Sequence, residues 1–204
     1  MTTDIALDFT GPFAWLSKSD LPCVFEVPMS RQSGIYLWTV GTTDGDLVYY
    51  VGETGREFGI RLTEHLKDQL AGMYHIYDPA AFVHGVKEPL WGGMFGKSHE
   101  GSLSEFVVRL PKLATALVGF VRVIRFYLAP FAGDARIRKR IEAALADHFY
   151  AQGGIVGQFQ DEGIHYERTR QGEAPLVVNC HWSGHIRGAP ETLVLSYEST
   201  IGAA

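Results

Sequence analysis

Several side chains between positions 36 and 65 could act together on a phosphodiester: Tyr36, Tyr50, Arg61 and His65. The planar guanidinium of an arginine binds phosphate oxygens and stays charged at any working pH. A phenol and an imidazole could position or deprotonate a water. The free imidazole, with a pKa near ~6.5 against ~10 for a phenol, starts closer to the required range. Gly52, two residues after Tyr50, would let backbone and substrate approach closely.

The two tyrosines are predicted to lie on one antiparallel hairpin, over residues 34–53. Residues 35–40 and 47–51 are rich in the β-branched and aromatic types that strands favour. Between them stands Asp44-Gly45, a strong hairpin signal, because glycine tolerates the positive φ that such turns need. The pattern therefore predicts that Tyr36 and Tyr50 lie on adjacent strands.

A helix is predicted directly after the hairpin, and it carries the arginine and the histidine. Its apolar residues recur at helical spacing and would face the sheet: Phe58, Leu62, Leu66 and Leu70. The helix is expected to begin near Arg56 or Glu57 and to stop at Gly72. Arg61 and His65 are four residues apart, so they share a neighbouring face one turn along.

A second long helix is predicted from an Asp134 cap to about Gln152. Its inner face is traced by apolar residues and one histidine: Ile137, Ile141, Ala144, Leu145, His148 and Phe149. Glu142 lies at the border of that face. His148 is expected to be a satisfied core residue rather than a ligand.

The remaining segments indicate a core with additions at both ends. Residues 1–32 are interpreted as an N-terminal strap on the core edge, with a strand at 23–27. Residues 33–152 form the core, and residues 73–119 are an insertion within it. Residues 153–204 are a C-terminal extension packed on the core, with strands at 174–179 and 191–196.

Inside the core, the insertion is expected to be loop-like from 73 to 97, because it contains several glycines and prolines. One short helix is expected to end at Leu110, and Pro111 is expected to start another that runs to Leu117. A strand over 120–128 is expected to end at Pro130.

The net charge of −5 argues weakly against a nucleic-acid partner, but the charge is uneven. Residues 106–141 carry eight basic residues and a single acid, Asp134. A localised basic strip on an acidic body can still bind phosphate. The candidate DNA-binding residues are Arg56, Arg122, Arg125, Arg136, Arg138, Lys139 and Arg140. The alternative is that these charges are ordinary solvated faces.

Membrane and secretory features are not indicated. No apolar run is long and uncharged enough to span a bilayer, and the N-terminus lacks the regions of a signal peptide. Two cysteines far apart in sequence indicate neither a disulfide framework nor a zinc knuckle. A reducing cytoplasm is the expected compartment.

The ordered set of residues resembles the GIY-YIG nuclease superfamily. The resemblance rests on Gly34-Ile35-Tyr36, on Tyr50-Val51-Gly52 and on a helix in which Phe58, Arg61 and Leu62 fit the family register. Some members carry a histidine one turn after the arginine, which His65 matches. A later helix supplies a metal-binding glutamate, which Glu142 matches. The resemblance covers about residues 34–152, and the ordered set is more specific than either tripeptide alone.

The resemblance implies an α/β (α+β) fold with a small, mainly antiparallel central sheet flanked by helices. It implies a metal-dependent endonuclease that hydrolyses phosphodiester bonds of double-stranded DNA, as a homodimer if both strands are cut. Glu142 would hold Mg²⁺ or Mn²⁺, and Arg61 would bind the nonbridging oxygens. Tyr36, Tyr50 and His65 would position or deprotonate the water.

Other interpretations stay open. Many members have an asparagine shortly after the glutamate helix, whereas this chain has none between Glu142 and Asn179. That departure and the acidic net charge favour a catalytically inactive module of the same fold that binds nucleic acid or protein. A small-molecule enzyme using tyrosine and histidine is supported by the residue types alone. Individually, Arg61 could pair with Glu57 or Glu64, and the tyrosines could be core aromatics.

Overall fold

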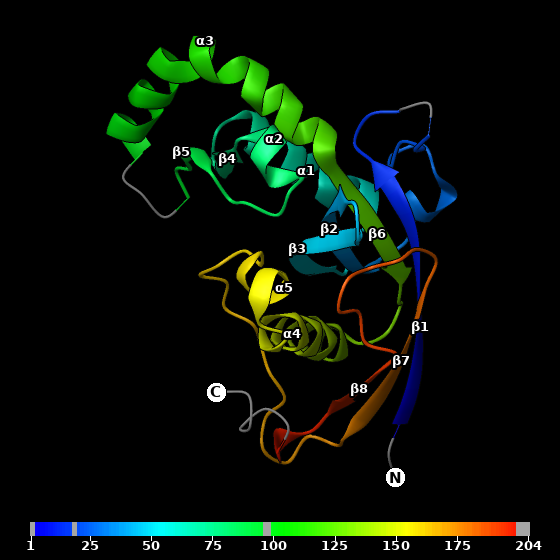
Figure 1. Ribbon diagram of the computed structural model, residues 1–204. Coiled ribbons are helices and arrows are strands. Elements are labelled where there is room, and N and C mark those ends of the chain that lie inside the picture. Colours follow the sequence, from blue (N-terminus) through cyan, green and yellow to red (C-terminus); the bar gives the residue numbers. More distant parts are fainter. Residues whose placement is uncertain (1–2, 18–19, 96–98, 199–204) are drawn as a thin grey trace.

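The helices and strands follow one another in a mixed α/β order. The computed structural model describes residues 3–17, 20–95 and 99–198. The elements are β1 (Thr3–Ala14), η1 (Pro28–Arg31), β2 (Gly34–Thr42), β3 (Gly45–Thr54), α1 (Phe58–Leu70), β4 (His75–Tyr77), α2 (Pro79–Phe82), β5 (Pro89–Gly92), α3 (His99–Val123), β6 (Ile124–Pro130), α4 (Ala135–Ala151), α5 (Gly154–Gln158), β7 (Leu176–Trp182) and β8 (Thr192–Leu195). Figure 1 shows their arrangement.

A curled, mainly antiparallel sheet organises the molecule. Its strand order is β3-β2-β6-β1-β7-β8, and only the β1–β7 pair is parallel. β1 changes partner along its length, since residues 3–9 pair with β7 and residues 10–14 pair with β6. The small pair β4–β5 forms a second sheet. The expected mainly antiparallel sheet flanked by helices is therefore confirmed.

The hairpin predicted over residues 34–53 is confirmed as β2 and β3. Its register sets Tyr36 opposite Gly52 and Trp38 opposite Tyr50. Gly45 follows the turn with a φ of 110°, a backbone conformation that is strained for a residue with a side chain. β3 is an edge strand, so one side of it faces away from the sheet.

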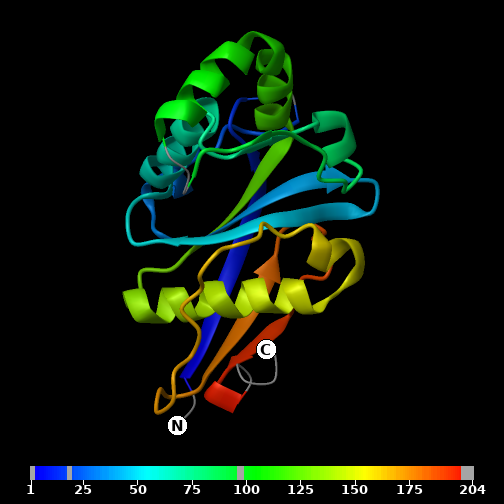
Figure 2. The ribbon, with the colours of Figure 1, turned by 90° about the vertical axis from the view of Figure 1, so that its left-hand side faces the viewer.

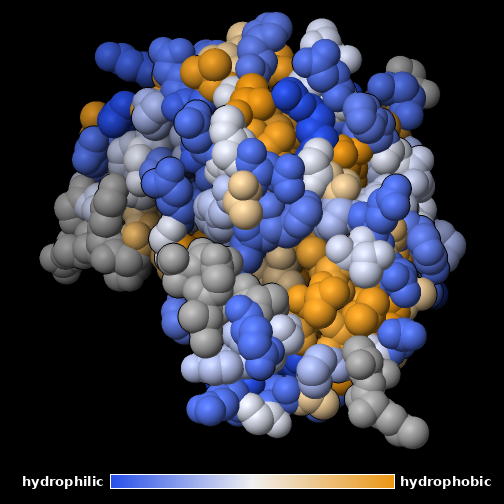
Figure 3. All heavy atoms as spheres, turned by 60° about the horizontal axis from the view of Figure 1, so that its bottom comes forward, coloured by the Kyte–Doolittle hydropathy of each residue, from blue (hydrophilic) through white to orange (hydrophobic). Residues whose placement is uncertain are grey.

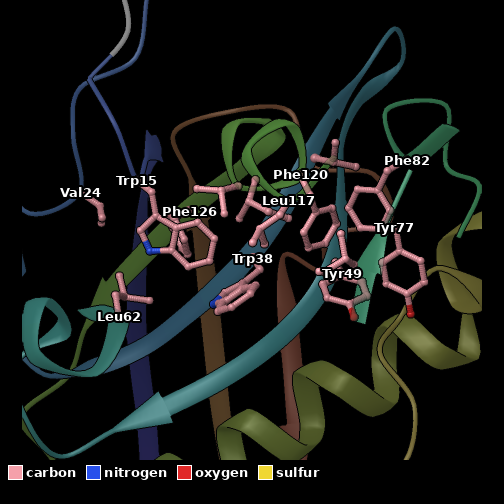
Figure 4. Packing of buried hydrophobic residues seen from close by; sticks show 14 of the residues in the cluster. Trp15, Val24, Trp38, Tyr49, Leu62, Tyr77, Phe82, Leu117, Phe120 and Phe126 are labelled. Carbon is pink, nitrogen blue, oxygen red and sulfur yellow. The ribbon is translucent and has the colours of Figure 1, made fainter. Parts of the chain in front are cut away.

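Helices cover both faces of the sheet. Figure 2 shows α1, α2 and α3 on one side of the β2–β3 hairpin and α4 on the other. Successive strand residues point to opposite faces, so Tyr36 and Trp38 join the cluster under α1 and α3, which Figure 4 shows. Ile35 and Leu37 join the cluster under α4, with Ile141 of that helix. The two tyrosine positions, 36 and 50, therefore face α1.

α3 corrects the prediction of two helices separated at Pro111. It is one continuous helix with Pro111 inside it, and Figure 2 shows its bend. A proline removes one helical hydrogen bond and bends the helix. Phe106 before the proline and Leu113 and Leu117 after it are all buried, so burial of this face outweighs the lost bond.

The strand expected over 120–128 begins later, because residues 120–123 finish α3 and β6 begins at Ile124. A short apolar run can be buried equally well as helix or strand, so sequence pattern alone does not separate them. The predicted end at Pro130 is confirmed.

The N-terminal segment corrects the expectation of a strap. Residues 3–14 form β1 inside the sheet, between β6 and β7. The strand expected over 23–27 is absent from that described stretch, where Cys23 forms an isolated bridge with Ala14 and Glu26 N–H donates to the Cys23 carbonyl in a turn. The segment 73–97, expected to be loop-like, contains β4, α2 and β5 within its described part.

The two strands predicted near the C-terminus are confirmed as β7 and β8. Leu176, Val178 and Leu195 join the cluster that contains Leu7 and Ile141, so the segments before and after the tyrosine hairpin share one core. The predicted Asp134 cap of α4 is also confirmed, because its carboxylate accepts a hydrogen bond from Arg136 N–H. His148 is half-buried and contacts the Gly188 carbonyl at 2.9 Å, a structural role.

Across the part of the chain that the structure describes, no helix combines the length and the apolar character that a membrane span needs. Figure 3 shows the face seen from the bottom of Figure 1, where hydrophilic residues predominate and hydrophobic residues gather in a few areas, the largest at the lower right. β8 ends the sheet toward that side, and its Val194 is 58% exposed.

Candidate active site

Tyr36 and Gly52 meet across the hairpin. The Tyr36 side chain is fully buried, and its hydroxyl lies 2.8 Å from Nε2 of His65 on α1. A Cβ at position 52 would stand 2.4 Å from Cζ of Tyr36, so only glycine leaves room for that ring. A Cβ at Gly34, where φ is 152°, would stand 2.2 Å from the Ala129 carbonyl oxygen of β6. At both positions, 34 and 52, glycine is therefore required because a larger residue would clash.

Replacing Gly52 with alanine is expected to displace the Tyr36 ring and to destabilise the protein by about 1–3 kcal/mol, as overpacking in a tight core does. Thermal or urea unfolding measures the change. Gly59→Ala is the matched control, since its Cβ would approach no closer than 3.3 Å to Ser30. Alanine is also the better helix former at that position in α1, so equal destabilisation of both variants would contradict the steric explanation.

His65 is also deeply enclosed in the site. It is 4% exposed and packs against Tyr36, Tyr50 and Trp38, with ring centroids 5.1–5.9 Å away. Burial, together with the charge of Arg61, lowers the pKa of His65 to about 3. The imidazole is therefore neutral near pH 7 and offers one donor and one acceptor nitrogen.

Tyr50 and Arg61 lie nearer to solvent than Tyr36. Tyr50 is half-buried, and its ring centroid lies 6.0 Å from that of Tyr36. Burial and the negative charge of Glu142 raise the pKa of Tyr50 to about 12, although its interactions with Tyr36 and Arg61 oppose the rise. The Arg61 side chain is 32% exposed. The guanidinium therefore stands between the buried phenols and the surface.

Burial also raises the pKa of Tyr36 well above its ordinary value, and Arg61 only partly offsets the rise. Both tyrosines are thus protonated in the free protein. Neither tyrosine is therefore a phenolate before the reaction begins. A tyrosine that accepts a proton from one group must at the same time give its own proton to another.

Glu142 reaches the site from the opposite face of the sheet. It lies on α4, beneath the face that carries Ile35 and Leu37, whereas Arg61 lies on α1 above the other face. Its Oε1 accepts a hydrogen bond of 3.0 Å from Glu53 N–H of the edge strand β3. The carboxylate therefore lies at the outer edge of β3. The positive charge of Arg61 has a small lowering effect on the pKa of Glu142, so the two groups interact around that edge.

The environment of Glu142 suits a bound cation. Burial and the neighbouring Glu53 carboxylate raise the pKa of Glu142 to about 7. Among the described residues, Oε2 of Glu142 has no hydrogen-bond partner, which leaves that oxygen for a ligand. No cluster of three or more His, Cys, Asp or Glu side chains gathers within residues 3–17, 20–95 and 99–198. A single carboxylate fits Mg²⁺, which keeps most of its ligands as water or substrate oxygens.

Three arginines in or beside the site are held by acids. Arg56 contacts both oxygens of Glu64 at 2.7 Å, and Arg61 contacts the same carboxylate at 3.4 Å. Arg138 donates from Nε to Glu53 at 2.9 Å rather than to Glu142. Because these pairs are partly exposed, we expect them to position side chains more than to stabilise the fold.

The basic strip expected over residues 106–141 is largely neutralised by acids from elsewhere. Arg125 binds Asp46 at 2.8 Å, Arg136 binds Glu173 at 2.6 Å, and Lys139 binds Glu167. Arg140 is 5% exposed, so its predicted contact with DNA is wrong in this structure. It donates to the carbonyls of residues 174 and 195.

The sequence reasoning missed this pairing because Glu167 and Glu173 lie outside the strip and fold back against α4. Arg122 is exposed near the end of α3, two residues before Ile124, which pairs with Val40 of β2, four residues along that strand from Tyr36. Arg56, with 55% of its side chain exposed, is the predicted DNA-binding residue nearest to Arg61 in the chain.

Four of the five predicted catalytic residues come together between the hairpin and α1: Tyr36, Tyr50, Arg61 and His65. Glu142 lies at the edge of β3, near enough for its charge to act on Tyr50. Tyr74 was missed: its hydroxyl lies 3.0 Å from Nδ1 of His65, and it comes from the segment expected to be loop-like. Comparisons of the chain with protein-family models, with curated proteins and with solved structures found no match.

Proposed function

We propose that this chain is a metal-dependent endonuclease of the GIY-YIG type that hydrolyses phosphodiester bonds in double-stranded DNA. The observation that carries the proposal is the place of Glu142 at the edge of β3, where it accepts from Glu53 N–H and where its charge acts on Tyr50, together with the Tyr36–His65 hydrogen bond beside Tyr50. A phosphodiester needs a cation for its oxygens, a route for the water proton and counter-charge for the leaving oxygen. This set of residues can supply the first two and hold the metal that supplies the third.

Arg61 would bind the nonbridging oxygens of the scissile phosphate. Its guanidinium is partly exposed: Glu64 contacts Nη1 at 3.4 Å, and the Tyr36 hydroxyl lies close to the same group. A phosphate can therefore reach the remaining donors of the fork. Binding of the anion would also compensate the positive charge that holds down the pKa of His65, so substrate would make His65 a stronger base.

The proton of the attacking water would leave through the phenols. Tyr50 faces the surface, and the two hydroxyls are close enough that each shifts the pKa of the other. As the water oxygen bonds to phosphorus, Tyr50 accepts its proton and passes its own to Tyr36. Tyr36 in turn gives its proton to Nε2 of His65, 2.8 Å away. Each tyrosine stays neutral, which agrees with their raised pKa values.

Glu142 would hold Mg²⁺ or Mn²⁺ through the oxygen that does not accept from Glu53. An ion held there would supply counter-charge for the leaving 3′ oxygen. The products are a 5′-phosphate and a 3′-hydroxyl, and the leaving oxygen takes its proton from solvent. Glu53, held by Arg138, keeps the edge of β3 in place next to Glu142.

The substrate has room beside this site. An open cavity of about 420 Å³ lies where β2 begins and β3 ends, lined by Arg31, Gln32, Ser33, Gly55, Glu57, Pro130, Phe131 and Ala132. Gly55 borders the Arg138 guanidinium, so the cavity adjoins the Glu53–Glu142 side of the site. We propose that nucleotides flanking the scissile phosphate lie there. One site cuts one strand, so cleavage of both strands would require a homodimer.

A second candidate function is a binding module that does not cleave. The full burial of Tyr36 and the neutralisation of Arg136 and Lys139 by acids favour it. Such a module would bind DNA in a salt-sensitive way or bind a protein partner. The two cysteines, Cys23 and Cys180, are both unpaired, which fits the reducing cytoplasm proposed for either function.

Incubation of the purified chain with supercoiled, linear and branched DNA, with Mg²⁺ and with EDTA, tests the proposal. We expect cleavage only with the divalent ion. Nicked circles would indicate one site acting on one strand, and linear product would indicate paired sites. DNA binding without cleavage over Mg²⁺ and Mn²⁺ would instead favour the binding module.

A further inference from the structure

Two residues outside the expected catalytic set, Tyr74 and Asp68, continue the hydrogen-bond chain behind His65. Nδ1 of His65 lies 3.0 Å from the Tyr74 hydroxyl, and that hydroxyl donates to Oδ2 of Asp68 at 3.1 Å. On the other side of the ring, Nε2 lies 2.8 Å from the Tyr36 hydroxyl. Four side chains from β2, α1 and the segment after α1 therefore form one line.

The direction of this chain follows from its far end. A carboxylate only accepts, so the Tyr74 proton points to Asp68 and the Tyr74 oxygen is left to accept from His65. Nδ1 of His65 must then carry the proton. A neutral imidazole has one donor and one acceptor, so Nε2 accepts, and the Tyr36 hydroxyl donates to it. Asp68 thus decides which nitrogen of His65 carries the proton, and so whether Nε2, which faces Tyr36, accepts or donates.

The ionisable groups around His65 agree with this assignment. Tyr36 faces Nε2, and Tyr74, with Asp68 beyond it, faces Nδ1. The Tyr50 ring packs against the imidazole, and Arg61 and Glu64 of the same helix act on it through their charges. Burial and the Asp68 charge raise the pKa of Tyr74, so Tyr74 stays a donor. Without the Asp68 acceptor, the Tyr74 proton could turn toward Nδ1 and reverse every bond in the line.

The backbone holds Tyr74 where this chain needs it. α1 ends at Leu70, and Gly72 turns the chain back with a φ of 74°. Trp91 Nε1 donates to the Gly72 carbonyl at 2.7 Å, and Gln69 Nε2 donates to the His75 carbonyl at 3.0 Å. Both bonds are at least partly buried, so the turn that carries Tyr74 is tied to α1 and to β5 on either side.

We propose that Tyr74 and Asp68 are positioning residues that hold His65 with its proton on Nδ1, so that Nε2 receives the proton of Tyr36. This inference rests on the proposed function, because Tyr36 passes on the proton of the attacking water. When His65 becomes an imidazolium, its Nδ1–H is connected through the Tyr74 hydroxyl to the Asp68 carboxylate. Tyr74 and Asp68 would thus have a role like that of the third group that orients a catalytic histidine in other hydrolases.

The tautomer of His65 can be measured directly on the whole chain. In ¹⁵N-histidine-labelled protein, with His65→Gln to assign the signals, we expect Nδ1 to carry the proton and Nε2 to be bare. Tyr74→Phe should shift that population toward the other nitrogen, and Asp68→Asn, which keeps an acceptor oxygen, should shift it less. Tyr77→Phe is the matched control, because Tyr77 packs on Tyr49, Phe82 and Phe120 instead of on His65.

The same variants have a kinetic readout. Tyr74→Phe should slow single-turnover cleavage roughly 10-fold or more, as loss of an orienting partner does, while the DNA dissociation constant stays unchanged. Asp68→Asn keeps an acceptor oxygen but loses the charge, so its effect should be smaller.

A wild-type tautomer and rate in both variants would overturn the positioning role. Protein that never cleaves DNA but shows the expected tautomer, lost in Tyr74→Phe, would refute the nuclease and leave the hydrogen-bond chain standing.

Discussion

Arg61→Ala should lower the rate of DNA cleavage by about 10³-fold, because a preorganised cation at a transferring phosphoryl group contributes that much in comparable sites. The residue is central to the site: it stands beside both phenols, and its charge lowers the pKa of His65. Single-turnover cleavage with excess enzyme measures the effect. Arg61→Lys should recover only part of the rate, because an ammonium lacks the planar fork.

The control for Arg61 is Arg170→Ala, since the Arg170 side chain is 68% exposed and pairs with Glu167 in the C-terminal segment. It should cleave at the wild-type rate. A second readout does not need cleavage: removal of the Arg61 charge should raise the pKa of His65 in an NMR titration. Equal rates for Arg61→Ala and wild type would remove Arg61 from the mechanism, whatever the pKa of His65 does.

Glu142→Gln should have two effects of opposite sign. Cleavage with Mg²⁺ should fall on the order of 10³-fold, because metal stabilisation of the leaving oxygen is worth several kcal/mol and each ~1.4 kcal/mol is a factor of ten. Glutamine keeps an oxygen that can accept from Glu53 N–H. In EDTA at pH 8, by contrast, the free energy of unfolding should rise by about 1–3 kcal/mol.

The stability effect follows from the raised pKa of Glu142, about 7 in the folded protein against an ordinary value of 4.5. Below pH 4.5 the carboxyl is protonated in both states, so it costs the wild type nothing. Between pH 4.5 and 7 the unfolded state ionises first, and the wild type loses stability. Above pH 7 the loss is complete. The advantage of glutamine should therefore be absent near pH 4 and fully present at pH 8.

Urea unfolding at several pH values, in EDTA, measures this advantage. Glu105→Gln on α3 is the matched control, since the Glu105 side chain is 59% exposed and should change neither stability nor cleavage. If Glu142→Gln cleaves DNA at the wild-type rate, Glu142 is not the metal ligand. A variant that is no more stable at pH 8 than at pH 4 would contradict the buried carboxylate.

Local features of the chain were predictable because they depend on neighbours in sequence. The Asp44-Gly45 turn predicts the hairpin, the spacing of Phe58, Leu62 and Leu66 predicts α1, and Asp134 predicts the start of α4. The prediction that Pro111 separates two helices was wrong, because buried residues on both sides of the proline maintain a helix that local propensity would end. The place of residues 3–14 in the middle of the sheet depends on pairing with residues 125–128 and 176–182, a separation that no local pattern records.

The chemistry of the site divides in the same way. The identities and spacing of Tyr36, Tyr50, Arg61 and His65 on a hairpin and the following helix follow from the sequence alone, because adjacent elements fix their distances. Tertiary structure decided the rest: Glu142 approaches around the edge of β3 from the other face, Tyr74 and Asp68 orient His65, and Glu167 and Glu173 neutralise the expected basic strip. These contacts join residues that only the folded chain brings together, and burial there sets the pKa values on which the proposed chemistry depends.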